Sequence, residues 1–497
     1  MLKWKGFDNE KLLLSLLVLL SAAIRIFFLF KFDNITGEAT GHVVRALLTL
    51  EDPSLSLNFD GNSSTLYKYA IASFLYFWRD PVLAPRIFTS LFGILLVVPY
   101  YVTLKILFDR TIAFFSSLAL VFYPLHVVQS STATSDAVYY FFLFSSFCYF
   151  FSYKSDRERL SVLLLSALSF NIASLLRFEC WIFIPILFLL LWPKGKKAAF
   201  LFLILSIIFP CALLALNQIF HHDFLYSFNA PSKALHASVK AGRFFYDLSL
   251  WNWLAVLWRS SGPSWVIGGL SGIVLAFLMR QKRQLAIFFL VLLSAFTVNT
   301  LSARMWNNSR YSIILGLFLI PYAWFFVDRA LAFLGLRRII FFILSLIFLT
   351  VDFVQTAQKS VSQTTAMICM TPPEIINIAT WLKNHVRADE FLIIEGDPCN
   401  VWQNNIVLRS RLSPKRCMVI SMPVGGKSFF ENKEGFERYI LTHRTRYLVL
   451  NSESDLQKVL NFKLDQKKQR LGDISFEVVF EQDVFGYGKY LIYRISY

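Results

Sequence analysis

The sequence predicts an all-α polytopic membrane protein with about eleven transmembrane helices and a small C-terminal α/β domain on the outer face. The first observation is composition: 56% of the residues are hydrophobic and 16% are charged, whereas soluble domains carry roughly a quarter charged residues. The second is a series of apolar runs near the length that crosses a bilayer, and the third is the placement of Lys and Arg. The net charge of +17 follows membrane orientation, so no nucleic-acid partner is expected.

The apolar runs define the expected spans, since a spanning helix needs roughly 20 apolar residues. The spans lie near residues 12–31, 86–107, 111–126, 137–153, 160–176, 180–193, 198–218, 263–279, 285–302, 311–328 and 339–354. The stretch from Tyr69 to Trp78 is apolar but too short to span, so a re-entrant or interfacial helix is expected there. No small-residue cleavage site follows the first run, which therefore predicts an uncleaved first helix.

Basic residues alternate along the chain in the way that the positive-inside rule requires. With the N-terminus in the cytoplasm, each of the six short inside segments carries two or three Lys or Arg. The outside segment from His126 to Asp136 carries none. An odd number of spans then puts the C-terminal tail on the outer face.

The composition changes near residue 354, which predicts a membrane domain over 1–354 and a soluble domain over 355–497. Short apolar strands are expected at Phe391–Ile394, Met418–Ser421 and Tyr447–Leu450, with helices at Ile375–His385 and Phe436–Thr442. Strands that alternate with helices favour a small α/β domain. The sequence leaves open whether this domain shapes an acceptor site or only stabilises the protein.

Charged residues near a bilayer are costly and are candidates for function by default. In this chain they gather at the expected outer ends of the spans. The set comprises Arg25, Asp33, Glu38, Lys68, Asp136, Arg177, Glu179 and Arg310. Such a surface suits chemistry on a lipid headgroup, and it suits an ion pathway poorly because a pathway needs polar groups at mid-membrane depth.

Several of these residues lie in segments that resemble one family when taken in order. The segments are Thr36–Ala46, Asp80–Arg86, Tyr123–Ser130 followed by Ser135-Asp136, Arg177-Phe178-Glu179, and Ser309-Arg310-Tyr311 opening a span that contains Pro321. Together they resemble the GT-C membrane glycosyltransferases, and most closely the branch of the protein O-mannosyltransferases and lipid A aminoarabinose transferases (glycosyltransferase family 39 and its neighbours). The resemblance covers residues 12 to 330 and depends on order and spacing, since no single motif is specific.

The resemblance implies transfer of a hexose or pentose from a polyprenyl-phosphate-linked donor to a hydroxyl acceptor on a glycan, lipid or protein, with inversion. The implied general base is Glu38, with Asp33 and Asp136 as the other catalytic candidates, since a carboxylate accepts the proton of the attacking hydroxyl. The leaving lipid phosphate requires cationic donors, and the candidates are Arg310, Lys68, Arg25 and Arg177. Family members often carry two adjacent acids in the first loop, whereas this chain has Gly37-Glu38. No cofactor is predicted, and a requirement for a divalent metal stays open.

Simpler structural roles compete with these assignments. Glu38 and Asp136 are also suited to the first turn of a helix, where acids are favourable. Arg25 and Arg310 are also suited to anchoring a span at the interface, and Arg177 and Glu179 to neutralising each other. A transporter or lipid flippase, and a non-catalytic scaffold with the same fold, are the alternatives to an enzyme.

Overall fold

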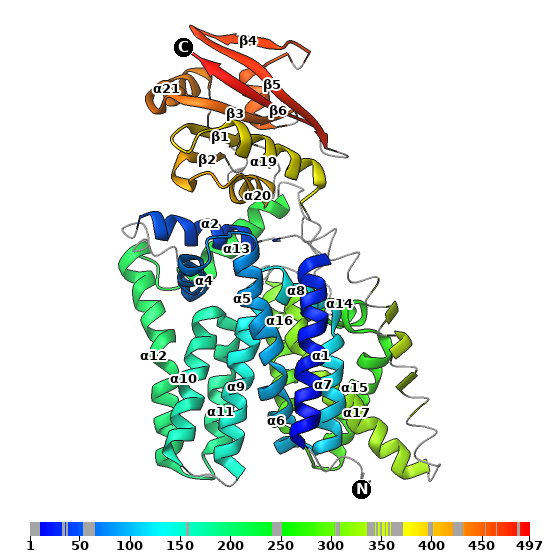
Figure 1. Cartoon of the computed structure of the whole chain (residues 1–497). Helices are drawn as coiled ribbons and strands as arrows, with labels where there is room; N and C mark the ends of the chain where they lie inside the picture. The colour runs from blue at the N-terminus through cyan, green and yellow to red at the C-terminus, as the bar shows by residue number, and fades with distance from the viewer. Residues whose placement is uncertain are drawn as a thin grey trace.

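The protein is described by a computed structural model. It describes residues 10–31, 35, 38–52, 65–155, 159–240, 251–302, 304, 309–334, 343, 346–347, 350–352, 354–355, 358, 371–395, 401–420, 430, 432–452, 454–463, 465–484 and 488–497. A bundle of long helices leads into a C-terminal domain with a sheet, and the described N-terminal helix begins at the end of the bundle opposite that domain (Figure 1).

Helices fill the described chain up to residue 334. They are α1 (Glu10–Lys31), α2 (Glu38–Glu51), α4 (Thr65–Phe77), α5 (Leu83–Leu95), α6 (Val97–Leu107), α7 (Arg110–Phe122), α8 (Pro124–Ser131), α9 (Asp136–Ser155), α10 (Leu160–Leu176), the 3₁₀ helix η1 (Phe178–Ile182), α11 (Phe183–Leu191), α12 (Lys196–His221), α13 (Tyr226–Lys240), α14 (Asn252–Ser261), α15 (Pro263–Leu278), α16 (Gln284–Leu301), η2 (Ser309–Tyr311) and α17 (Ser312–Leu334). Each expected span from 12–31 to 311–328 contains helix, and most of the last one, 339–354, lies outside the described residues.

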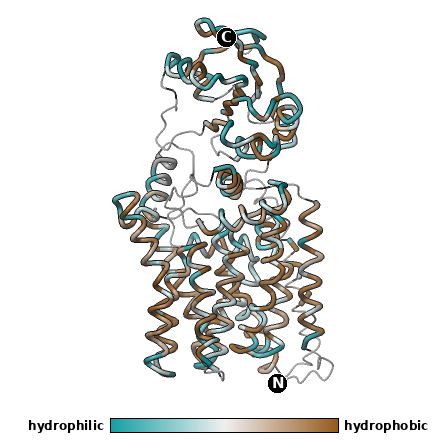
Figure 2. The backbone as a smooth tube through the Cα atoms, turned by 60° about the vertical axis from the view of Figure 1, so that its left-hand side comes forward, coloured by the Kyte–Doolittle hydropathy of each residue, from teal (hydrophilic) through white to brown (hydrophobic). Residues whose placement is uncertain are grey.

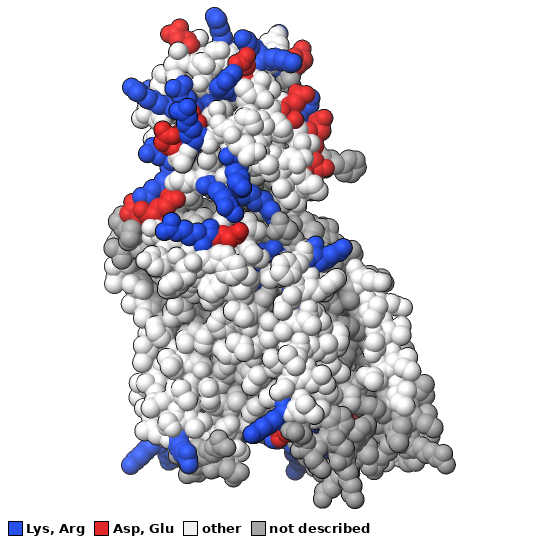
Figure 3. Space-filling view, viewed as in Figure 1, with Lys and Arg blue, Asp and Glu red and all other residues white. Residues whose placement is uncertain are grey.

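The apolar character of this bundle makes the chain a multi-pass membrane protein. Within the described residues, five helices are long and apolar enough to cross a membrane, or six if the bent pair α7–α8 forms one span, and three shorter apolar helices accompany them. Figure 2 shows the hydrophobic colour running along the bundle. In Figure 3 the Lys, Arg, Asp and Glu side chains gather at the two ends and leave the belt between them almost without charge.

One expected span, 111–126, is interrupted in the structure. Helix α7 ends at Phe122, and α8 leaves it at an angle of 55°. The break lies at Tyr123, whose backbone is extended with φ −65° and ψ 105°. A residue before proline is driven out of the helical region, so Pro124 explains why α7 stops and why α8 starts in a new direction.

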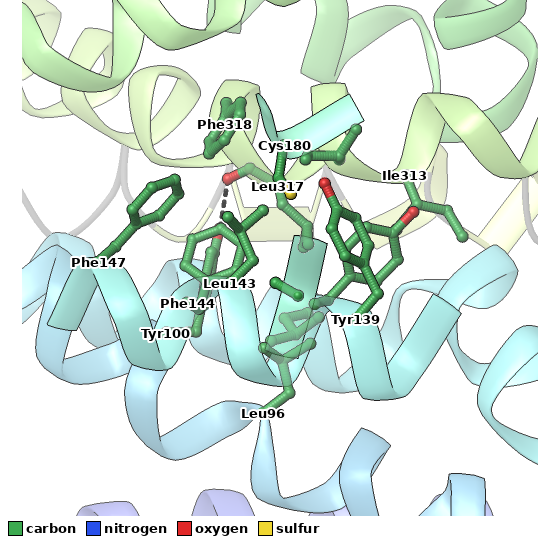
Figure 4. Packing of buried hydrophobic residues seen from close by; sticks show 14 of the residues in the cluster. Leu96, Tyr100, Tyr139, Leu143, Phe144, Phe147, Cys180, Ile313, Leu317 and Phe318 are labelled. Carbon is green, nitrogen blue, oxygen red and sulfur yellow. Dashed lines mark hydrogen bonds between the residues drawn. The ribbon is translucent and has the colours of Figure 1, made fainter. Parts of the chain in front are cut away.

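The centre of the bundle is packed with aromatic rings. Phe147 lies 5.1 Å from Phe288 and 5.6 Å from Phe144, measured between ring centroids. The Tyr100 hydroxyl donates to the carbonyl oxygen of Leu317 at 2.8 Å, which satisfies a buried polar group within this apolar layer (Figure 4). Side chains from α6, α9 and α17 therefore form one continuous core.

The C-terminal domain is a small α/β unit, as the sequence predicts. Its elements are α19 (Pro373–His385), β1 (Phe391–Glu395), α20 (Val401–Ser410), η3 (Pro414–Arg416), β2 (Cys417–Ile420), α21 (Lys433–His443), β3 (Thr445–Asn451), α22 (Asp455–Leu460), β4 (Lys468–Leu471), β5 (Ile474–Val484) and β6 (Gly488–Ser496). The strand order is β2-β1-β3-β6-β5-β4. The first three strands are parallel, and the antiparallel strands β6, β5 and β4 complete the sheet.

Helix α20 joins this domain to the bundle by lying against α2 (Figure 1). The Asn405 amide donates to the carbonyl oxygen of Ile35 at 3.2 Å, and Lys415 pairs with Asp52 at 3.0 Å. The domain therefore contacts both the segment that leads into α2 and the end of that helix.

Candidate active site

Helices α2 and α4 pack against each other at the end of the bundle that faces the C-terminal domain (Figure 1). Glu38 is the first residue of α2; its side chain is not among the described ones, and Asp33 lies outside the described residues. Lys68 lies in the first turn of α4 and is 5% exposed, with its Nζ 5.2 Å from the centroid of the Tyr69 ring. The loop acid favoured by the sequence and the buried lysine thus lie on two neighbouring helices.

The turn between α8 and α9 connects this pair of helices to the bundle. Ala133 adopts a left-handed backbone with φ 63°, and its carbonyl oxygen accepts a hydrogen bond from the hydroxyl of the buried Tyr67. Thr134 closes the same turn by donating to the carbonyl oxygen of Gln129 at 2.9 Å. Because Asp136 follows three residues after Ala133, this turn fixes the start of α9 relative to α4.

Asp136 is the centre of a buried ionic cluster. It is fully buried at the first position of α9 and pairs with Nη1 of Arg177, whose Nη2 lies 2.9 Å from Oε1 of Glu179. Nη1 of Arg310 lies 4.0 Å from the second carboxylate oxygen of Asp136. Arg177 therefore pairs with Glu179, as one of the sequence-based alternatives expected, and also with Asp136.

Aromatic side chains surround the cations of this cluster. The guanidinium carbon of Arg177 lies 4.6 Å from the centroid of the Tyr311 ring, and that of Arg310 lies 5.0 Å from the same centroid. Arg310 also donates to the Tyr311 hydroxyl at 3.2 Å. The charges of the two arginines are balanced by those of the two carboxylates, and both guanidinium groups lie near the Tyr311 ring.

Arg25 points into the bundle from α1. Its guanidinium contacts the Ser21 hydroxyl at 2.7 Å and Nδ1 of His126 at 2.8 Å. A side-chain carbon at Gly93 would lie 2.9 Å from Nε of Arg25, so the absence of a side chain there makes room for the arginine. These partners belong to α1, α5 and α8 rather than to the Asp136 cluster, and binding of a phosphate by Arg25 stays a prediction.

Two groups in this region were not selected from the sequence. Arg86 is buried on α5 and donates to the carbonyl oxygen of Ser131 at 3.0 Å, although the Asp80–Arg86 segment already contributed to the resemblance. Asn404 donates to the Thr40 hydroxyl at 3.4 Å, which brings the C-terminal domain to the first turn of α2. Periodicity carries no signal for such a contact, because it joins residues far apart in the chain.

Within the part of the chain that the structure describes, no three His, Cys, Asp or Glu side chains come together in a way that could hold a metal ion. Asp33 and the carboxylate of Glu38, two of the catalytic candidates, are outside that description. A metal requirement accordingly stays open.

Comparison with known proteins defines the fold. The model of a family described as dolichyl-phosphate-mannose-protein mannosyltransferase matches residues 62–217. The structure of ArnT from Cupriavidus metallidurans in the apo state is 11% identical, with a TM-score of 0.66 over 96% of this chain and 97% of that chain. The chain has the fold of the GT-C glycosyltransferases. The GT-C resemblance predicted from the sequence is thereby confirmed.

Two further GT-C structures contain lipid phosphates. ArnT from the same organism, bound to undecaprenyl phosphate, aligns with a TM-score of 0.63 and 11% identity over 97% of this chain and 98% of that chain. The second is the archaeal oligosaccharyltransferase AglB from Archaeoglobus fulgidus, in complex with an inhibitory peptide and a dolichol-phosphate. It aligns with a TM-score of 0.61 and 11% sequence identity over 90% of this chain and 70% of that chain. No curated protein sequence matches the chain.

Proposed function

We propose that this protein transfers a sugar from a polyprenyl-phosphate-linked donor to a hydroxyl acceptor at the outer membrane face, with inversion at the anomeric carbon. The observation that carries the proposal is the convergence, at one end of a GT-C bundle, of the helix that begins at Glu38, the buried Lys68 and the Asp136 cluster. The lipid phosphates in ArnT and AglB support a donor of this class.

The proposed reaction is a single displacement. The acceptor oxygen gives its proton to the carboxylate of Glu38, with Asp33 as the alternative base, and attacks the anomeric carbon as the bond to the phosphate oxygen breaks. General base catalysis of this kind contributes roughly 10²–10⁴-fold to a rate. Attack opposite to the leaving phosphate inverts the configuration.

The leaving lipid phosphate needs positive charge in a site of low polarity. Lys68 supplies a compact cation from a buried position, and Arg310 supplies a guanidinium, which can bind phosphate through two parallel hydrogen bonds. Arg177 is held between Asp136 and Glu179, so its proposed part is to keep the cluster in place. Asp136 in turn orients Arg177 and lies within 4.0 Å of Arg310.

The orientation is part of the proposal. The positive-inside rule puts the N-terminus in the cytoplasm. The C-terminal domain lies at the other end of the bundle from the described start of α1 (Figure 1). With that orientation, the site and the domain that covers α2 lie on the outer side.

The proposal is tested in sealed liposomes that contain the purified full-length chain. Radiolabelled sugars linked to polyprenyl phosphate are supplied on one side, with a membrane extract as acceptor, and the anomeric configuration of the product is read by NMR. We expect label to move to the acceptor, with inverted configuration, only when donor and acceptor meet the face that carries the C-terminal domain.

Other outcomes favour the other classes. Movement of the lipid donor across the bilayer without transfer to an acceptor would indicate a flippase. Retained configuration in the product would contradict the single displacement. The absence of both activities with a full set of hexose and pentose donors would favour the non-catalytic scaffold.

A further inference from the structure

Three interruptions of the helical bundle meet beside the candidate active site. The first is the break between α7 and α8 at Tyr123. The second is the end of α14, where Gly262 has φ 96° and the proline that follows it starts α15. The third is the 3₁₀ helix η2, which carries Arg310 and passes directly into α17. Both α8 and α14 contact η2, so the three interruptions lie together.

Side-chain hydroxyl groups connect these interruptions. The Tyr123 hydroxyl lies 2.9 Å from Oγ of Ser261 at the end of α14. Oγ of the neighbouring Ser260 lies 2.8 Å from Oγ of Ser312, the first residue of α17. The Ser312 hydroxyl donates to the carbonyl oxygen of Ser309 at 2.6 Å, so Ser260 is the donor of the bond between the two serines. We call four of these side chains the hydroxyl network, namely those of Tyr123, Ser260, Ser261 and Ser312.

The hydroxyl network is closed off from solvent. All four of its side chains are buried. A side-chain carbon at Gly316 would lie 2.7 Å from the Tyr123 hydroxyl oxygen and 3.2 Å from Oγ of Ser261, so the absence of a side chain on α17 makes room for the pair. A buried hydroxyl that loses its partner costs free energy. The network therefore favours one arrangement of the three segments over others.

The backbone that the network fixes is the backbone on both sides of Arg310. Ser309 comes directly before this arginine, and Ser312 follows two residues after it. A further contact comes from α9, where the hydroxyl of Tyr140 donates to the carbonyl oxygen of Arg310 at 3.4 Å. Tyr140 lies four residues after Asp136, whose carboxylate is 4.0 Å from Nη1 of Arg310. The position of η2 therefore determines where the guanidinium lies relative to the buried ionic cluster.

We propose that the hydroxyl network is a positioning device that holds Arg310 in place to bind the leaving lipid phosphate. This inference rests on the proposed function, in which Arg310 binds that phosphate. The four hydroxyl groups act through the backbone of η2 and not on the phosphate itself. Two parallel hydrogen bonds from a guanidinium to a phosphate require a fixed geometry, and binding groups keep such a geometry when surrounding hydrogen bonds support them.

The test is a double-mutant cycle on the full-length protein in neutral detergent. Binding of undecaprenyl phosphate is measured by native mass spectrometry for the wild type, Ser312→Ala, Arg310→Ala and the variant that carries both changes. Tyr100→Phe is the matched control. Its buried hydroxyl also donates to α17, at the carbonyl oxygen of Leu317 at 2.8 Å, but within the aromatic core. Thermal unfolding is measured for every variant.

We expect Ser312→Ala to bind undecaprenyl phosphate about fivefold more weakly than the wild type, the effect of losing one hydrogen bond. Arg310→Ala is expected to bind it at least about tenfold more weakly. In the double variant Ser312→Ala adds no further loss, because the network acts through the arginine that is already absent. Tyr100→Phe is expected to lose stability but to bind the lipid like the wild type. In transfer assays, Ser312→Ala raises the KM for the lipid donor about fivefold and leaves the KM for the acceptor unchanged.

Wild-type binding by Ser312→Ala, with weaker binding by Arg310→Ala, would overturn this inference and leave the proposed function intact. A further loss in the double variant would do the same, as would an equal loss of affinity in Tyr100→Phe. Wild-type binding by Arg310→Ala would contradict the phosphate contact of the proposed function, and this inference with it. If Ser312→Ala unfolds at a lower temperature than Tyr100→Phe, Tyr123→Phe replaces it in the cycle, with an expected loss of about threefold.

Discussion

Replacing Asp136 by asparagine tests whether the buried ionic cluster stabilises the end of the bundle that faces the C-terminal domain. The substitution preserves the shape of the side chain and removes a charge that is fully buried beside two arginines. Breaking a buried ion pair costs about 3–5 kcal/mol, because the remaining charge is left without compensation. Arg177 keeps Glu179 at 2.9 Å, so we expect the low end of that range, a loss of about 3 kcal/mol.

The free energy of unfolding is measured by titrating the detergent-solubilised protein with a denaturing detergent. Glu179→Gln is the matched control, since its side chain is 22% exposed and a partly solvated pair contributes about 1 kcal/mol or less. A loss for Asp136→Asn no larger than the loss for Glu179→Gln would refute the view that the cluster is a stabilising centre.

Three other predictions concern packing, the contact between domains and a thiol. Gly272→Ala lowers the free energy of unfolding by about 2 kcal/mol in the same titration, because the new carbon would lie 2.0 Å from the backbone oxygen of Tyr322. Asn405→Leu lowers it by about 1–3 kcal/mol, since the buried carbonyl of Ile35 loses its donor. Burial, together with a nearby glutamate, raises the pKa of Cys417 to about 12, so its thiol stays protonated at pH 8. The rate at which a maleimide labels this thiol, measured by peptide mass spectrometry, therefore rises about tenfold per pH unit up to that pKa.

The packing prediction has a matched control variant, and each of the three predictions has an outcome that would contradict it. Gly195→Ala meets nothing within 4 Å and is expected to leave stability unchanged; an equal loss at both glycines would contradict the packing explanation. An unaltered stability of Asn405→Leu would show that the contact with Ile35 contributes little. Labelling of Cys417 in the folded protein at the rate of an ordinary thiol, whose pKa lies near 8.5, would contradict the raised pKa.

The helices of the bundle could be predicted from sequence because apolar runs of spanning length have few alternatives in a membrane. The break at Tyr123 could not be located by hydropathy, since α7 and α8 form one continuous apolar run and only the proline marks the turn. Helices α13 and α14 lie in a segment that the sequence predicts as the second long outer loop; that segment lacks such a run, and the two helices were not expected. The strands β1, β2 and β3 were each predicted, because short buried strands in a parallel sheet appear as continuous apolar runs.

The candidate site was predictable as a set of residues but not as a set of contacts. Asp136, Arg177 and Arg310 were singled out by the cost of placing charges near a bilayer. Arg177 lies between Asp136 and Glu179 because α9 packs against α10 and η1. The spacing of residues in the sequence does not determine this packing. The pairing of Arg25 with His126 joins residues 101 positions apart, and hydropathy contains no information on it.

The most direct test of the central claim is sugar transfer by Glu38→Gln in the reconstituted system. The matched control is Glu51→Gln, which removes an exposed carboxylate from the other end of the same helix. Loss of a general base predicts a rate reduced by roughly 10²–10⁴-fold for Glu38→Gln, with normal membrane insertion and with near wild-type transfer by the control. Equal transfer by Glu38→Gln and the wild type would contradict the assignment of the base, and transfer by neither would contradict the proposed enzyme.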